Sequence, residues 1–257
     1  MNPTGTQLGD GSRYATTSLL NGDVLAQSGS FSNSTVTGNY VAYEVSASNG
    51  DGVSTFPTSL DSALVYLSVQ SGNQFAITID ENGGQGQITL EKSQGPYTYS
   101  IDSNGRMTLG SGQPVFYPAN GAQAFGTEQP SSTNQGGPSL ITVQQQVSGT
   151  FGCAATTGTF AVGTPQAPTA INVTNGISNL STDTFTIDQS DPYGVLNLGL
   201  TGTITCTTDS LSATTGRFVL TNNFGSTQVG YTVVPSKYVL MPIDPFNGQP
   251  NAITVEK

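Results

Sequence analysis

The chain has 257 residues and few charges, with six Lys plus Arg against sixteen Asp plus Glu, a net charge of −10 and no histidine. Because no cluster of basic side chains is available to neutralise phosphates, this composition argues against binding to nucleic acid or to anionic lipid. The lack of histidine excludes Ser-His-Asp and Cys-His nucleophilic machinery and the usual histidine-based zinc sites.

Residues 1–37 form an extension in front of the repeated part of the chain. Residues 1–6 carry neither a basic nor an apolar region, so we expect no signal peptide here, and no run reaches the 18 apolar residues of a membrane-inserted helix. Residues 13–20 and 23–27 indicate one or two strands. Such an orphan strand pairs with its own domain, packs on its surface or completes a sheet in another subunit. The candidate self-assembly strand comprises Tyr14, Leu19, Leu20, Val24 and Leu25.

The rest of the chain is predicted to be two copies of one domain of about 110 residues, residues 38–146 and 147–257. Four short motifs recur in the same order, at offsets between 108 and 112: Gly38-Asn39-Tyr40 with Gly149-Thr150-Phe151, Thr78-Ile79-Asp80 with Thr186-Ile187-Asp188, Asn104-Gly105-Arg106 with Thr215-Gly216-Arg217, and Ile141-Thr142-Val143-Gln144 with Ile253-Thr254-Val255-Glu256. Because almost no linker separates the copies, we expect them to hold a fixed relation to each other.

Both copies show short, alternating runs of β-branched and aromatic residues that predict strands. They lie at 63–69, 74–79, 86–91, 97–101 and 106–109 in the first copy, and at 184–187, 195–198, 203–206, 217–220, 229–234 and 237–241 in the second. Residues 80–85 and Asn104-Gly105 indicate hairpin turns. No segment has the apolar stripe of a helix.

The predicted fold is therefore all-β. We expect two tandem antiparallel β-barrel or β-sandwich domains of about 110 residues each, plus the N-terminal strand segment. A barrel is preferred, because a meander of about eight strands can close on itself and leave no unpaired edge.

Four stretches carry a resemblance to a known family: 37–40, 101–109, 234–241 and 251–256. They resemble tandem calycin- or lipocalin-like β-repeat domains of predicted secreted proteins from environmental bacteria, a functionally uncharacterised group. The resemblance spans 31–257 and implies a barrel fold and a secreted protein, with no catalytic residue to transfer. Residues 115–118 depart from the pattern, because a longer hairpin stands at this place in the second copy.

The two cysteines, Cys153 and Cys206, both lie in the second copy. The repeat offset places their counterparts at Ala42 and within 95–98, where no cysteine occurs. Two cysteines gained together indicate a disulfide, which would imply an oxidising, extracytoplasmic compartment. Two buried free thiols are the alternative.

The acidic residues of the predicted loops are the candidates for chemistry. A two-carboxylate glycosidase is the enzyme class that survives best, and its candidates are Asp80, Glu81, Glu91, Asp188 and Asp191. We expect no cofactor; calcium is the metal that oxygen ligands at 80–82 and 188–191 would suit, although neither stretch has the spacing of a defined calcium loop. Turn formation is the competing explanation for these residues.

The sequence leads to three functional hypotheses. The first is a non-enzymatic extracellular structural protein, a subunit of a cell-surface fibre or layer that assembles through β-strand or domain–domain contacts, with copies of itself or other cell-surface proteins as partners. The second is a secreted barrel that binds a small apolar ligand or a glycan, and it requires an internal cavity lined by positions such as Phe75, Ile77 and Tyr99. The third, an enzyme, is disfavoured.

Overall fold

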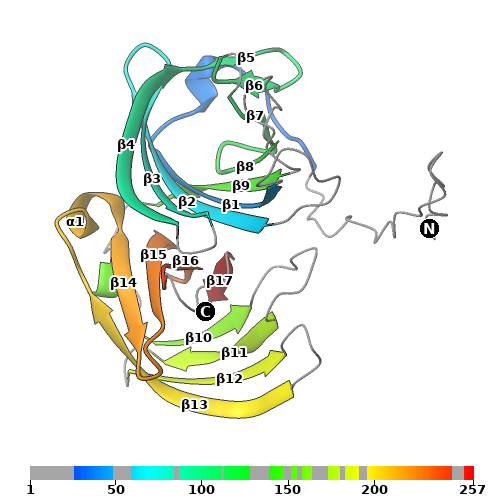
Figure 1. Cartoon of the computed structure of the whole chain (residues 1–257). Coiled ribbons are helices and arrows are strands. Elements are labelled where there is room, and N and C mark those ends of the chain that lie inside the picture. Colours follow the sequence, from blue (N-terminus) through cyan, green and yellow to red (C-terminus); the bar gives the residue numbers. More distant parts are fainter. Residues whose placement is uncertain are drawn as a thin grey trace, which may run out of the picture.

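The computed structural model describes residues 26–48, 59–83, 87–110, 113–127, 139–147, 152–154, 158–163, 173–179, 183–190, 196–244 and 252–257. These residues are nearly all in antiparallel strands, as the alternating sequence pattern predicts, and they build two domains that pack against each other (Figure 1). The helical elements among them are short: the 3-10 turns η1 (Asn33–Thr35) and η2 (Gly152–Ala154), and the helix α1 (Ser212–Thr215).

The first domain is a strongly curved sheet of nine strands, which we call the half-barrel. Its strands are β1 (Asn39–Ser48), β2 (Ser59–Gln70), β3 (Gln74–Asn82), β4 (Ile88–Thr98), β5 (Ser100–Ile101), β6 (Met107–Thr108), β7 (Val115–Pro118), β8 (Gln123–Thr127) and β9 (Ser139–Gln146). They pair in the order β4-β3-β2-β1-β9-β8-β7-β6-β5, so the two edge strands, β4 and β5, follow each other in the chain. The predicted Asn-Gly hairpin joins β5 to β6.

The second domain is a closed eight-stranded barrel with strands paired in chain order. Its strands are β10 (Thr159–Gly163), β11 (Val173–Asn179), β12 (Thr184–Ser190), β13 (Leu196–Thr207), β14 (Arg217–Asn222), β15 (Thr227–Val234), β16 (Lys237–Pro242) and β17 (Ile253–Glu256). The runs at 195–198 and 203–206 belong to a single strand, β13. Closure by the β10–β17 pair confirms the barrel expected for an eight-stranded meander.

The two domains pair their strands in the same cyclic order, except that β4 and β5 of the half-barrel take the place of the single strand β13, and this order agrees with the predicted internal repeat. β1 pairs with β2 and β9, and β10 pairs in the same way with β11 and β17. One predicted motif pair is corrected. Gly149-Thr150-Phe151 lies outside the described residues and precedes β10, so the counterpart of Gly38-Asn39-Tyr40 is Gly158-Thr159-Phe160, where the glycine again has a positive φ just before the first strand.

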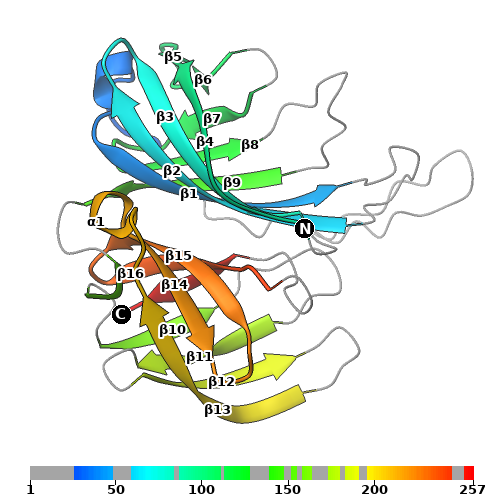
Figure 2. The ribbon, with the colours of Figure 1, turned by 60° about the vertical axis from the view of Figure 1, so that its left-hand side comes forward.

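Three apolar clusters account for the packing. One lies inside the half-barrel and includes Phe75 and Tyr99, and one lies inside the barrel around Phe218 and Tyr238. The third lies between the domains, where outward-facing residues of β1 and β2 contact those of β15 and β16 (Figure 2). Because strand residues alternate between faces, β1 and β2 supply both the core of the half-barrel and the domain interface.

The part of the N-terminal extension that is described, residues 26–37, packs on its own half-barrel. Ser28 N–H donates to the Ala119 carbonyl at 2.9 Å, and Asn33 bonds to both Tyr99 and Ile101. This part contains η1 and no strand, so a predicted strand reaching residue 27 is wrong at its end. The five residues of the candidate self-assembly strand lie outside the described residues.

Within the described part of the chain, no helix has the length and apolar character needed to cross a membrane.

Candidate functional site

An aspartate caps a β-bulge at the same place in each domain. The register between β3 and β4 shifts next to Asp80, and Asp80 Oδ1 accepts the Glu91 backbone N–H at 2.9 Å, where Glu91 has a φ of 56°. In the barrel, Asp188 Oδ1 accepts the Gly199 N–H at 2.7 Å, and Gly199 has a φ of 63°. Both aspartates lie inside strands. The hairpin predicted at 80–85 does join β3 to β4, but its loop begins after Asn82 rather than at Asp80.

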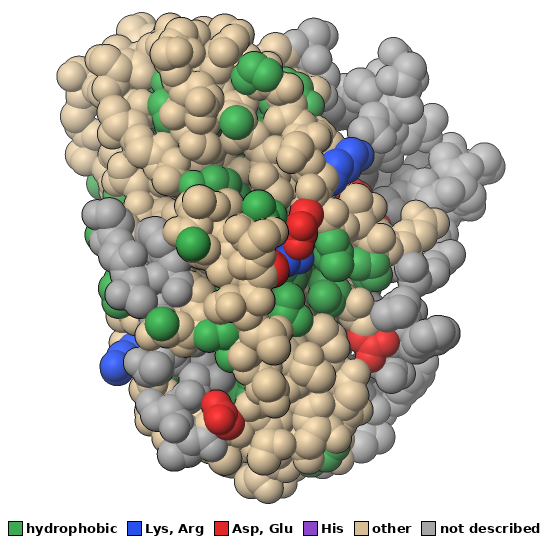
Figure 3. Space-filling view, turned by 90° about the vertical axis from the view of Figure 1, so that its left-hand side faces the viewer, with side chains coloured by type: hydrophobic (Ala, Val, Ile, Leu, Met, Phe, Trp, Pro, Cys, Tyr) green, Lys and Arg blue, Asp and Glu red, His purple; other side chains and the backbone are tan. Residues whose placement is uncertain are grey.

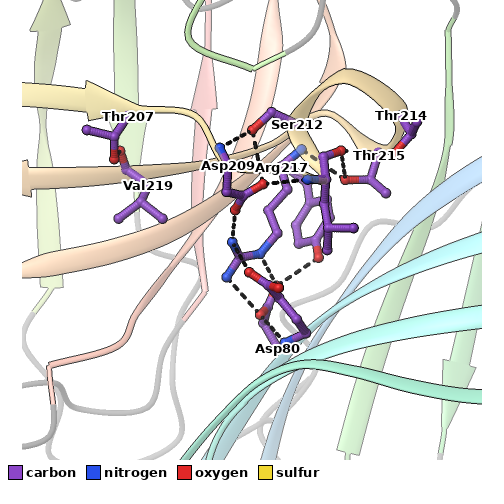
Figure 4. Close-up of polar contacts among 11 residues, drawn as sticks. Asp80, Thr207, Asp209, Ser212, Thr214, Thr215, Arg217 and Val219 are labelled. Atoms are coloured by element: carbon purple, nitrogen blue, oxygen red, sulfur yellow. Dashed lines mark hydrogen bonds and ion pairs between the residues drawn. The ribbon is translucent and has the colours of Figure 1, made fainter.

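Asp80 also forms a buried ion pair with Arg217 across the domain boundary, and we call this contact the clasp (Figure 4). Arg217 comes from β14 at the edge of α1, and its Nε donates to Asp80 Oδ2 at 2.9 Å while Nη2 donates to Oδ1 at 3.1 Å. The Arg217 side chain is 2% exposed and that of Asp80 is fully buried. A guanidinium is suited to such a bidentate, planar contact with a carboxylate, and the contact fixes the relative orientation of the two groups.

Two further carboxylates and a tyrosine complete the clasp. Arg217 Nη1 contacts Asp209 and lies 2.9 Å from Glu91 Oε1, and the Tyr231 hydroxyl donates to Asp80 Oδ2 at 2.7 Å. Burial, followed by the charge of Asp80, raises the pKa of Tyr231. Burial alone would lower the pKa of Arg217, but the hydrogen bonds and charge of Asp80 outweigh it and raise that pKa. The guanidinium therefore stays charged.

Apolar side chains surround the clasp. Val41, Leu64 and Tyr66 of the half-barrel pack on five buried residues of the barrel: Val229, Tyr231, Val233, Val239 and Met241. The Tyr66 and Tyr231 rings stack with centroids 6.4 Å apart. On the face in Figure 3, acidic and basic atoms meet beside hydrophobic side chains. This apolar surround shields the ions from water and strengthens their attraction.

Hydrogen bonds from side chains of the half-barrel to backbone carbonyls of the barrel tie the domains together at several more points. Tyr66 Oη donates to the Thr214 carbonyl at 3.2 Å, and Asn82 Nδ2 donates to the Pro242 carbonyl at 2.8 Å. Gln146 Nε2 donates to the carbonyls of Thr215 and Thr232, at 2.8 and 2.7 Å. An apolar centre combined with hydrogen bonds is typical of a specific interface, and these bonds hold the domains in one arrangement.

The half-barrel contains a cavity of about 370 Å³ beneath residues 28–36 of the extension. Phe75, one of the positions predicted to line a cavity, does so; Ile77 and Tyr99 belong to the packed core beside it. None of the lining residues is charged, and one polar group among them is already paired, because Tyr40 Oη donates to the Gly121 carbonyl at 3.1 Å. The cavity suits a small, neutral, mostly apolar molecule.

The cavity exists because β8 carries a small residue where β16 carries a large one. Ala124 lies opposite Pro118, and Tyr238 lies opposite Thr232 at the equivalent place in the barrel. Two residues along, Gly126 takes the place of Leu240, but Phe116 opposite it takes the place of Gly230 and fills that space. Tyr238 packs among the barrel's core residues, whereas Ala124 lines the half-barrel's cavity.

Cys153 and Cys206 form the predicted disulfide, which links η2 to β13. The half-barrel joins the equivalent elements by hydrogen bonds instead, because Asn33 of η1 accepts the Ile101 N–H at 2.8 Å and the Tyr99 hydroxyl at 3.2 Å. The corrected alignment thus makes Asn33, rather than Ala42, the counterpart of Cys153.

The structure brings two of the proposed glycosidase carboxylates together, because Asp80 and Glu91 both pair with Arg217. Glu81 follows Asp80 in β3, Asp188 lies in the other domain, and Asp191 is outside the described residues. Around the proposed calcium ligands, the described residues contain no group of three or more His, Cys, Asp or Glu side chains that would hold a metal. Asn82 donates its amide to Pro242 and lies in β3 rather than in a loop.

Arg217 and Tyr231 were missed by reasoning from the sequence. Arg217 falls within a repeat motif, and it is one of only six cationic residues in the chain. Its place at the start of a continuous apolar run, Arg217-Phe218-Val219-Leu220, is the available signal that its side chain lies close to a packed surface, because such a run indicates a strand covered on both faces.

No protein-family model matches the chain, and no curated protein matches it either.

Proposed function

We propose that the protein is a non-enzymatic structural component of an extracellular or cell-surface fibre or layer, built from copies of a rigid two-domain subunit. The clasp is the observation that carries this proposal. A bidentate, buried Arg217–Asp80 pair inside an apolar interface holds the two domains in one fixed orientation. A fibre or layer with a regular repeat requires subunits of such fixed shape.

Two further features agree with this role. The Cys153–Cys206 disulfide fits an oxidising compartment, where such bonds persist. The low charge and the dominance of uncharged polar residues also suit a protein whose surface meets other protein surfaces rather than nucleic acid. The assembly would use domain–domain contacts, strand donation from the N-terminal extension, or both.

Sedimentation velocity and negative-stain imaging over a range of concentrations test the structural role. We expect concentration-dependent polymers of regular repeat. Deleting residues 1–25 then separates the two routes, because residues 26–37 belong to the fold of the half-barrel and must stay. Polymers that vanish on this deletion would indicate strand donation, and polymers that persist would indicate domain contacts. A strictly monomeric protein at all concentrations would refute the structural role.

The cavity favours a second candidate, a module that binds a small apolar ligand or a glycan. An apolar fluorescent probe such as N-phenyl-1-naphthylamine should bind with a stoichiometry of one. Ala124→Tyr copies Tyr238 of the barrel and fills the cavity, so it should abolish probe binding. Ala161→Tyr, an exposed site on β10, is the matched control. Equal probe binding by Ala124→Tyr and wild type would refute this candidate.

A further inference from the structure

The clasp has two different sides, which the two domains contribute. The half-barrel contributes the carboxylate side, formed by Asp80 and the outward residues of β1 and β2. The barrel contributes the arginine side, formed by Arg217 and Tyr231 with the outward residues of β15 and β16. Because the domains are repeats, each has its own version of both sides, and only one version of each is used within the chain.

The barrel has an unused carboxylate side centred on Asp188. Leu64 lies opposite Asp80 in the β2–β3 pair, and Asn175 lies opposite Asp188 in the β11–β12 pair. Asp188 caps its bulge with Oδ1, as Asp80 does, which leaves Oδ2 available. Asp188 is exposed and forms no ion pair among the residues that the structure describes.

The half-barrel has an unused arginine side centred on Arg106 and Tyr117. Arg217 lies opposite Tyr231 in the β14–β15 pair. In the half-barrel Met107 lies opposite Phe116, which places Arg106 level with Tyr117 in the same way. Phe125 then lies opposite Tyr117 as Val239 lies opposite Tyr231. Tyr117 is 48% exposed, and Arg106 has no ion pair within the described ranges.

These two unused sides lie toward opposite ends of the molecule. In Figures 1 and 2, β12 and β13 lie at one end, while β5 and β6 lie at the other. A contact between them in different chains is head-to-tail, so it does not close on itself unless the rotation between subunits makes a ring. A carboxylate side would then contact an arginine side at every domain boundary in the assembly, both within a chain and between neighbouring chains.

We propose that the chain assembles head-to-tail, with Asp188 of one copy bound by Arg106 and Tyr117 of the next, in an intermolecular version of the clasp. This inference rests on the proposed structural function and names its contact. The opposite charges and the matching bulge geometry support it.

The intermolecular contact is expected to be weaker than the clasp. On the carboxylate side, Ala161 takes the place of Val41 and offers less apolar area. On the arginine side, Tyr117 and Phe125 supply aromatic surface in compensation. A smaller apolar contribution and more exposed charges predict reversible association that weakens as ionic strength rises.

The test is sedimentation velocity of the full chain over a concentration series at low ionic strength. Arg106→Glu places like charges at the contact, and Asp188→Asn keeps the bulge acceptor while removing the charge. Each should weaken association by about tenfold or more. Lys92→Glu is the control, because it makes the same change in charge as Arg106→Glu at an exposed position on β4, and it should leave association unchanged.

The outcomes separate this contact from the wider proposal. Wild-type assembly that Arg106→Glu leaves unchanged would overturn the contact while keeping the structural function. A wild type that remains monomeric throughout would overturn both. Thermal unfolding of each variant must match that of wild type, since neither Arg106 nor Asp188 forms an ion pair in the described part of the monomer.

Discussion

Replacing Arg217 with methionine is the sharpest test of the clasp. The change keeps most of the apolar length of the side chain but leaves the fully buried Asp80 carboxylate with only the Tyr231 hydroxyl at 2.7 Å and the Glu91 N–H at 2.9 Å. Removing one partner of a buried ion pair costs about 3–5 kcal/mol, because the remaining charge is uncompensated. We expect a loss of this size in the free energy of unfolding.

The clasp is asymmetric, which gives a second expected result. Arg217 pairs with three carboxylates, whereas Asp80 pairs with one cation, Arg217, among the described residues. Asp80→Asn leaves the guanidinium paired with Asp209 and Glu91 and keeps an oxygen for the Glu91 N–H, so it should cost less than Arg217→Met. Leucine at position 80 together with methionine at 217 removes both charges and should recover part of the loss.

Urea denaturation at neutral pH, with linear extrapolation to water, measures these differences. Lys237→Met is the matched control, because the Lys237–Glu256 pair is 20% and 56% exposed and an exposed pair contributes about 1 kcal/mol or less. A cost below about 1 kcal/mol for Arg217→Met, or an equal cost for Asp80→Asn, would contradict the reasoning from burial.

Two further predictions concern pH and the disulfide. Burial and the charge of Asp80 raise the pKa of Tyr231 in the folded protein above the unfolded value of about 10. The protonated tyrosine therefore contributes its full stability below pH 10, and this stability is lost as the pH rises further, by about 1.4 kcal/mol per pH unit. Tyr231→Phe should flatten the fall of unfolding free energy with pH above 10 by up to this slope, and an unchanged slope would contradict it. Serine at both Cys153 and Cys206 opens a loop with a separation of 53 residues and should cost about 4 kcal/mol in urea denaturation; a cost under about 1 kcal/mol would show that the cross-link does not restrict the unfolded chain.

The sequence was sufficient to predict the strand content, the repeat and the disulfide, because each depends on local patterns or on a comparison of the copies. The Ile141 and Ile253 motifs occupy equivalent strands, β9 and β17. The first motif was misaligned, since β10 is shorter than β1 and a Gly-Thr-Phe triplet occurs twice near the start of the second copy. The β-bulges at Asp80 and Asp188 were not foreseen, because a β-bulge uses the same kinds of residue as a hairpin loop.

The clasp was beyond prediction from one sequence, for a physical reason. Asp80 and Arg217 are 137 residues apart and meet through domain packing, which no periodicity reports. The cavity, in contrast, has a signal in the chain: Ala124 stands where the second copy has Tyr238, whereas Phe116 makes up for Gly126 in the place of Leu240. Comparing the interior positions of the two copies, strand by strand, would have located it, because a loss of large side chains without replacement leaves space.

The cavity and the clasp use opposite faces of the same strands, so the two proposed functions can be tested independently. Tyr40 and Leu67 line the cavity, whereas their neighbours Val41 and Tyr66 pack against the barrel. A variant that fills the cavity at Ala124, on β8, alters neither Asp80 nor Arg217, and a variant of Arg217 changes no residue that lines the cavity. Assembly that survives Ala124→Tyr would therefore show that the half-barrel's interior is not needed for self-association. Probe binding that survives Arg106→Glu would show that ligand binding does not depend on assembly.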